Sequence, residues 1–191
     1  SKTIVVNGIT LTLDNGNYYS GSIRFTQGTA VEVSGIEDLE EAYNRDFFSY
    51  DATTEKLTFL GETGTWEVYY SLKYNYMWMA RMNDVAPDAF WIIGHGFTSA
   101  PVWSSDYNSG GWDLEDIARM AYAVKVADYK YQATVYLNNT HEWGGFDMQI
   151  FSRRDWVGAD EMAIFSSSSL TGDSQLLQEV RMPMSAVVLD S

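Results

Sequence analysis

Short runs of alternating apolar and polar residues, separated by turn-forming residues, constrain this chain more than any other feature of its sequence. In residues 9–13 (ITLTL), the three apolar side chains fall on one face of a strand. Many short runs of this kind, with turn signals roughly every 8–12 residues, are typical of β-sandwiches. Aromatic residues, which favour strands, make up 15% of the chain. We expect strands at residues 4–6, 9–13, 18–25, 31–33, 57–60, 66–71, 76–81, 89–93, 121–126, 129–137, 146–152, 161–165 and 177–181.

Residues 36–48 (IEDLEEAYNRDFF) have the periodicity of a helix instead. Their apolar residues Ile36, Leu39, Tyr43 and Phe47 recur at steps of three and four, and acidic residues near the start suit a helix N-terminus. The sequence therefore predicts one short helix in the first half. One or two further helical turns are expected later, in the segment DLEDIARM.

The polar stretch Asn83–Asp88 predicts a domain boundary, because it holds one of only three prolines and separates two strand-rich halves. We place the boundary between two modules, residues 1–84 and residues 85–191. The expected fold class is all-β, with two tandem immunoglobulin-like β-sandwich modules and one short helix in the first.

Charge and composition restrict the partners of the chain. The formal net charge is −14 with only 12 lysines and arginines, which argues against nucleic acid and anionic membrane surfaces. Neutral or cationic partners are expected, and neutral sugars fit. The chain contains no cysteine, so disulfides, thiol nucleophiles and thiolate metal sites are excluded. No apolar run of 18 residues predicts a membrane span, and any export signal or lipid anchor is expected upstream.

The strongest candidate chemistry is aromatic. Trp103, Tyr107 and Trp112 lie in a glycine- and serine-rich stretch, and Trp143 and Trp156 follow near later turns beside amide and guanidinium side chains. A sugar ring packs its C–H face on an aromatic plane, and its hydroxyls bond to amide, carboxylate or guanidinium groups. The candidate ligand-binding residues are Trp112, Trp103, Tyr107, Trp143, Arg153 and Trp156. By contrast, Trp66, Trp78 and Trp91 lie within apolar strands and are expected in the core.

Catalysis has less support in the sequence. His95 and His141 belong to no metal or triad motif, and the Gly-His-Gly around His95 is expected to form a turn after the strand at 89–93. Carboxylates near the aromatic residues leave a small glycosidase as an alternative, but 26 acidic residues make such pairs unavoidable. We expect no enzymatic activity.

No cofactor is expected either, with a structural calcium ion as the alternative. Asp106, Asn108 and Gly110 recur at every second position, and the acids of residues 113–116 follow. This spacing departs from an EF-hand loop at its fifth position, where glycine replaces a ligand.

Several short motifs give the chain a family resemblance. The segments DAFWIIGHGF, GGWDLEDIARM, YKYQATVYL and FDMQIF resemble the C-terminal modules of SusE/SusF-type outer-membrane lipoproteins of gut bacteria. The first half, with YYSGSIRFTQGTAVEVSGI, RDFF and GTWEVYY, is similar to the β-module that precedes such domains. The resemblance implies paired β-sandwich domains that are anchored to the cell surface by an upstream lipid. It also implies non-catalytic capture of polysaccharide for a neighbouring transporter and its enzymes.

The resemblance assigns the candidate residues unequally. Trp112 matches the Gly-Trp motif of the family, whereas Trp143 and Arg153 match only by their distance downstream. Trp103 and Tyr107 lie in a loop longer than the family's, so they inherit no role and the glycan stays open. A second hypothesis is an interaction module that docks on an outer-membrane transporter or another surface partner through an apolar aromatic patch.

Overall fold

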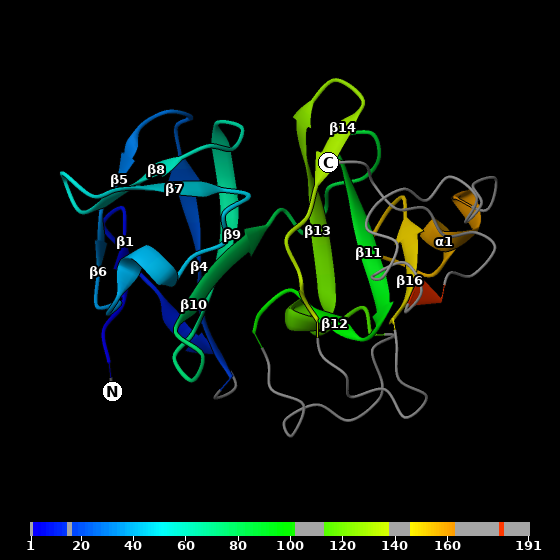
Figure 1. Ribbon diagram of the computed structural model, residues 1–191, viewed down its shortest axis with the longest axis horizontal. Helices are drawn as coiled ribbons and strands as arrows, with labels where there is room; N and C mark the ends of the chain where they lie inside the picture. Colours follow the sequence, from blue (N-terminus) through cyan, green and yellow to red (C-terminus); the bar gives the residue numbers. More distant parts are fainter. Residues whose placement is uncertain (1, 15–16, 102–112, 138–145, 163–179, 182–191) are drawn as a thin grey trace. The chain divides into compact units, whose positions relative to one another are not determined.

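The computed structural model describes residues 2–14, 17–101, 113–137, 146–162 and 180–181 (Figure 1). The chain divides into two compact units, Ser1–Met82 and Asn83–Ser191, which are described separately below. The described residues form mainly antiparallel strands with one short α-helix. The prediction of an all-β fold is therefore confirmed.

The first unit is built from three small antiparallel sheets. Their orders are β2-β1-β6, β10-β9-β4-β3 and β5-β8-β7. The longest pairing joins β4 to β9, from Tyr19 opposite Tyr70 to Phe25 opposite Gly64. The strands are β1 Val5–Val6, β2 Ile9–Thr10, β3 Thr12–Asp14, β4 Tyr18–Phe25, β5 Ala30–Val31, β6 Val33–Ser34, β7 Phe48–Asp51, β8 Lys56–Phe59, β9 Gly64–Ser71 and β10 Tyr76–Ala80.

Aromatic side chains fill the core of the first unit. Alternate residues of β9 point inward, so that Trp66, Val68 and Tyr70 are fully buried. The Trp66 ring packs edge-on against Phe47 and Phe59, with ring centroids 5.3 and 6.0 Å away. These contacts confirm that Trp66 is a core residue, and Trp78 of β10 is buried as predicted too.

The predicted helix at residues 36–48 is wrong. The segment contains only one 3-10 turn, η1 Leu39–Glu41, which follows Asp38 in a left-handed conformation (φ 48°), and it ends in β7. Its backbone instead bonds to β10, where Asn44 N donates to Met77 O (2.9 Å) and Met77 N donates to Ala42 O (2.7 Å). The spacing of apolar residues was helical, but sheet-edge hydrogen bonds decide the conformation.

The described residues of the second unit form one five-stranded sheet and one two-stranded sheet. Their orders are β14-β13-β11-β16-β17 and β12-β15, and only the β16–β17 pairing is parallel among the described strands. The strands are β11 Ala89–His95, β12 Phe97–Thr98, β13 Met120–Ala127, β14 Lys130–Gln132, β15 Tyr136–Leu137, β16 Phe146–Phe151 and β17 Val180–Arg181. The helical elements are η3 Ile117–Arg119 and α1 Val157–Glu161, so the one described α-helix lies in the second unit and not in the first.

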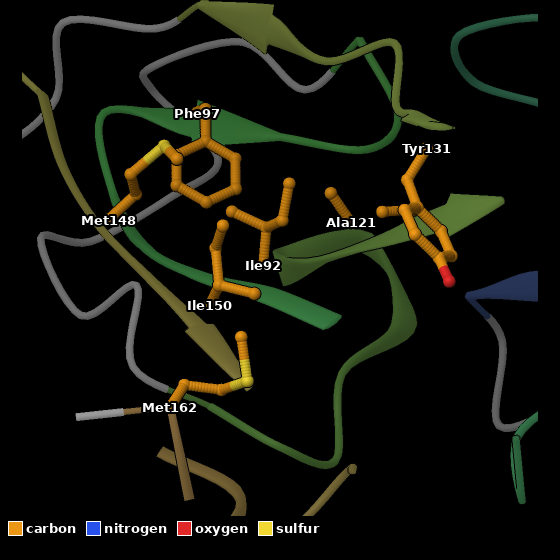
Figure 2. Packing of buried hydrophobic residues seen from close by; sticks show 8 residues of the cluster. Ile92, Phe97, Ala121, Tyr131, Met148, Ile150 and Met162 are labelled. Carbon is orange, nitrogen blue, oxygen red and sulfur yellow. The ribbon is translucent and has the colours of Figure 1, made fainter. Parts of the chain in front are cut away.

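Both faces of the central strand β11 are buried. On one face, Ile92 packs with Phe97, Ile150 and other apolar side chains in a single cluster (Figure 2). On the other face, the Trp91 ring lies edge-on to Tyr122, with centroids 5.2 Å apart, and its indole N–H donates to Asp84 O (3.1 Å). Trp91 is fully buried, which confirms the prediction that it belongs to the core.

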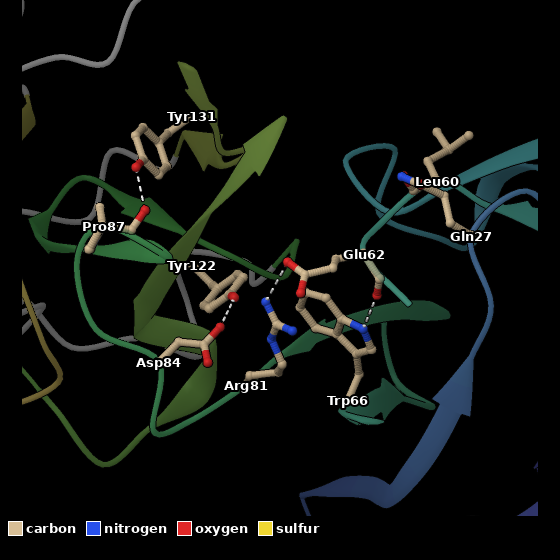
Figure 3. A network of polar contacts seen from close by, with 9 residues as sticks. All are labelled: Gln27, Leu60, Glu62, Trp66, Arg81, Asp84, Pro87, Tyr122 and Tyr131. Atoms are coloured by element: carbon tan, nitrogen blue, oxygen red, sulfur yellow. Dashed lines mark hydrogen bonds and ion pairs between the residues drawn. The ribbon is translucent and has the colours of Figure 1, made fainter. Parts of the chain in front are cut away.

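Polar contacts hold the start of the second unit to its sheet (Figure 3). The Tyr122 hydroxyl donates to the Asp84 carboxylate, and the Tyr131 hydroxyl donates to Pro87 O. Because Tyr122 and Tyr131 come from β13 and β14, these two bonds tie the polar stretch 83–88 to two strands of the same sheet.

Three expectations for the second unit need correction. The strand predicted at residues 89–93 continues to His95, and the turn is made by Gly96 alone (φ 85°), because β12 begins at Phe97. The strand predicted at 129–137 is divided into β14 and β15, and Tyr129 lies in the preceding turn. The strand predicted at 161–165 begins within α1 instead.

Candidate functional site

The described residues include two of the six predicted ligand-binding residues. Arg153 and Trp156 lie just after β16, at the edge of the second unit, and they are close together in the chain. The other four, Trp103, Tyr107, Trp112 and Trp143, lie outside the described residues.

Arg153 and Trp156 belong to a compact segment, residues 152–162, which we call the Trp156 loop. The Asp155 N–H donates to Arg153 O (2.9 Å), and the Gly158 N–H donates to Asp155 O (3.0 Å). The backbones of Arg153 and Gly158 almost touch, since a Cβ on Gly158 would stand 2.5 Å from Arg153 O. The chain therefore reverses sharply between Arg153 and Gly158 and carries Trp156 on the reversal.

The Trp156 side chain is packed on one edge and open to solvent elsewhere. Its ring lies edge-on to the buried Phe151 ring, with centroids 5.8 Å apart and planes at 63°. Trp156 is nevertheless 55% exposed, and its neighbour Val157 is 51% exposed. Of the described tryptophans, Trp156 is the only one among the exposed large hydrophobic residues.

Two carboxylates hold the Arg153 guanidinium. Arg153 Nε lies 3.3 Å from Asp155 Oδ2, and Arg153 Nη2 lies 3.2 Å from Glu161 Oε1. The second oxygen of Glu161 accepts a hydrogen bond from the Ser152 hydroxyl. The three charged side chains are each about half exposed, so we expect their pairing to fix geometry more than to add stability.

The acidic residues near the start of η3 have structural roles. Asp113 Oδ1 accepts from the N–H of Glu115 (2.8 Å) and of Asp116 (3.3 Å), and Asp116 Oδ1 accepts from Ala118 N–H (3.0 Å) as the cap of η3. These are turn and cap bonds of the kind that carboxylates form at helix starts. The residues Asp106, Asn108 and Gly110 of the calcium alternative lie outside the described residues.

Arg154 connects this acidic segment to the Trp156 loop. Its Nη1 donates to Leu114 O (2.7 Å), which joins two segments 40 residues apart in the sequence. The loop is therefore fixed at its base by Arg154 and by the bond from Ser152 N–H to Gly158 O (3.1 Å). Within the residues that the structure describes, no group of three or more His, Asp or Glu side chains is arranged to hold a metal ion.

Comparisons with protein-family models, characterised proteins and solved structures gave no match. A function for this chain therefore has to be inferred from its sequence and from the geometry of its described residues. Among those residues, none of the helices is long and apolar enough to cross a membrane.

The sequence did not indicate the residues that shape the site around Trp156. Asp155, Gly158 and Glu161 follow one another at steps of three residues, and this combination of two acids and a glycine matches no binding motif. Trp156 itself was predicted as a candidate because it lies near a turn beside Arg153 and Arg154. Its side chain is 55% exposed.

Proposed function

We propose that the chain is a non-catalytic glycan-binding protein and that Trp156 is part of its binding surface. The observation that carries the proposal is a half-exposed indole mounted on a fixed chain reversal, in a loop that also carries charged side chains. An aromatic ring that is open to solvent offers a stacking surface for the C–H face of a sugar. Carboxylate and guanidinium groups of the same loop can supply partners for sugar hydroxyls.

The fixed position of Trp156 favours binding over a purely incidental exposure. A side chain that is held before the ligand arrives loses less conformational entropy on binding. The edge contact with Phe151 and the close approach of Gly158 to Arg153 both restrict the indole. Trp112, Trp103, Tyr107 and Trp143 are proposed to add to the same function, on the basis of the sequence alone.

The proposal includes a cellular setting. We place the chain among surface-exposed outer-membrane lipoproteins of bacterial polysaccharide utilisation, with two immunoglobulin-like β-sandwich modules and a transporter complex as neighbour. The motif resemblance, the all-β fold and the acidic, cysteine-free composition support this setting.

Calorimetric titration with plant, host-mucin and microbial oligosaccharides tests the function. We expect binding to at least one glycan, and loss of most of that affinity in Trp156→Ala, because a stacking contact of one aromatic ring contributes about 0.5–1.5 kcal/mol beyond the area that it buries. Trp156→Phe keeps a ring and is expected to retain part of the affinity. Tyr129→Ala is the matched control, since it removes another exposed ring of the same unit. No binding to any glycan by the folded protein would contradict the proposal.

A specific observation also favours the alternative of a protein-docking surface. Trp156 and Val157 are adjacent and both more than half exposed, so they form a small apolar patch. Val157→Asp separates the two functions. It is expected to leave glycan affinity within about threefold of wild type if stacking on Trp156 dominates. It would abolish binding to an outer-membrane transporter partner if the patch is a protein interface.

A further inference from the structure

The ion pairs of the Trp156 loop indicate which class of sugar this surface accepts. We infer that it binds neutral or amino-bearing glycans and discriminates against uronate and sulfated glycans. This inference rests on the proposed function, because it concerns the ligand of the same indole surface. The inference is based on the ion pairs of Arg153, the arginine that the sequence predicts as the basic partner of the sugar.

Two carboxylates of the same loop already compensate the positive charge of Arg153. One edge of its guanidinium faces Asp155 (Nε to Oδ2, 3.3 Å), and a second nitrogen faces Glu161 (Nη2 to Oε1, 3.2 Å). A free arginine would present its planar fork of donors to an incoming carboxylate or sulfate. Here two nitrogens of that fork already face carboxylates of the same loop, so an anionic ligand group would have to approach against two negative charges.

The remaining charges of the loop add to this effect. Residues 152–162 contain two arginines and three carboxylates, which leave a formal charge of minus one. The second arginine, Arg154, donates from Nη1 to the backbone oxygen of Leu114. The third carboxylate, Asp160, is exposed on α1. A ligand with a negative charge therefore meets carboxylates of like charge, within a chain whose formal net charge is −14.

The same carboxylates suit a ligand that donates hydrogen bonds. Ionised Asp155 and Glu161 are acceptors only, and each oxygen has capacity for more than one donor. Sugar hydroxyls and the ammonium group of an amino sugar are donors, and bonds from them to a carboxylate are stronger than bonds between neutral groups. An indole in the same short loop as such acceptors matches a sugar ring that carries hydroxyls or an ammonium group.

The structure also provides variants that separate the pairing of Arg153 from net charge. In Asp155→Asn/Glu161→Gln, both partners of Arg153 lose their charge while their size is kept, so the guanidinium becomes available to an anion. Asp160→Asn removes one negative charge from the same loop and leaves both ion pairs of Arg153 in place. If availability of the guanidinium controls selectivity, only the double variant gains affinity for anionic glycans.

The experiment uses the full chain and an array of immobilised glycans in four classes: neutral, amino-bearing, uronate and sulfated. The strongest member of each class is then titrated in solution at two salt concentrations. We expect neutral or amino-bearing glycans to bind at least about tenfold more tightly than uronate or sulfated ones, and Trp156→Ala to lose most of that affinity. In Asp155→Asn/Glu161→Gln, uronate binding is expected to rise about tenfold or more and to weaken with salt, whereas Asp160→Asn changes it little.

Failure of the inference is distinguishable from failure of the proposed function. Wild-type binding to a uronate or sulfated glycan that depends on Trp156 would overturn the inference and keep the function. Silence of the folded protein across all four classes would overturn both. Neutral-glycan binding that is unchanged in Trp156→Ala would remove this surface from the site and overturn the inference, while the glycan-binding function itself would stand.

Discussion

Gly158 and Arg153 are packed backbone against backbone at the base of the Trp156 loop. A Cβ on Gly158 would lie 2.5 Å from Arg153 O and 2.9 Å from Arg153 N, distances that the fixed main chain cannot accommodate without moving. Only glycine has no side chain beyond hydrogen, so this single residue permits the reversal that carries Trp156.

Gly158→Ala is therefore expected to disturb the loop. We predict a loss of about 1–3 kcal/mol in the free energy of unfolding, since backbone atoms have to shift. Glycan affinity is expected to fall as well, because Trp156 loses its fixed position. Urea unfolding followed by circular dichroism measures the first effect, and Asp160→Ala, an exposed change on the same helix, is the control. Equal stability of the two variants would show that Gly158 has room for a side chain.

A substitution at Tyr129, unlike that at Gly158, is expected to raise the free energy of unfolding. It lies in the turn between β13 and β14 with a φ of 59°, a conformation that L residues adopt at a cost, and its side chain is 99% exposed. We expect Tyr129→Gly to raise the free energy of unfolding by about 0.5–1 kcal/mol. Tyr129→Asn should give part of this gain, because Asn tolerates the left-handed region. Tyr129→Ala keeps the strain and should give none. A stabilisation by Ala as large as that by Gly would refute the backbone explanation.

Tyr70 predicts how stability depends on pH in the alkaline range. Burial, followed by the nearby charges of Glu37 and Tyr19, raises the pKa of the Tyr70 hydroxyl above its ordinary value of 10.0. Because the folded state disfavours the phenolate, the unfolded chain loses this proton first. The contribution to stability is thus complete below about pH 10 and is lost as the pH rises through the folded-state pKa.

The matching variant is Tyr70→Phe. It removes the ionisable group and also the hydrogen bond from the Tyr70 hydroxyl to Asn75 Oδ1 (2.5 Å), so the variant starts from lower stability near neutral pH. Its stability should nevertheless decrease less steeply than that of wild type between about pH 9 and pH 11. Chemical unfolding at stepped pH values provides the comparison, with Tyr129→Phe as an exposed-tyrosine control. Parallel curves for wild type and Tyr70→Phe would contradict this explanation.

Local alternation predicted the strands well, because the side chain of a strand residue has only two directions to take. The bounds predicted for 18–25 are those of β4, and the buried Trp66 and Trp91 were identified from their apolar neighbours. The same local argument fails where a distant segment provides the hydrogen bonds. Residues 42–44 have helical spacing, yet they bond to Met77, more than 30 residues away in the sequence.

In the candidate site too, the neighbouring residues in the chain predict some features, whereas contacts between residues further apart determine others. Trp156 was predicted as a candidate from its place near a turn beside two arginines, and its side chain is 55% exposed. The ion pair between Arg153 and Glu161 joins residues eight positions apart across α1, a helix that the sequence did not predict. The residue type of Arg153 predicted a basic partner for the sugar. In the structure, however, this arginine already pairs with two carboxylates of its own loop.

Arg81 covers the indole of Trp66 in the first unit, and this contact supports a last prediction. The guanidinium carbon lies 4.2 Å from the Trp66 ring centroid, Arg81 Nη2 lies 3.5 Å from Glu62 Oε2, and the Trp66 N–H donates to Glu62 O at 3.0 Å (Figure 3). A planar cation that stacks on an indole and is largely shielded from water contributes about 1–2 kcal/mol.

Arg81→Ala is expected to lose about that much in urea unfolding, and Arg81→Lys about half, because an ammonium group does not stack as a plane. Arg24→Ala, an exposed arginine on β4, is the control and should change the unfolding free energy by less than about 0.5 kcal/mol. If Arg81→Lys is as stable as wild type, charge alone and not stacking explains the contact.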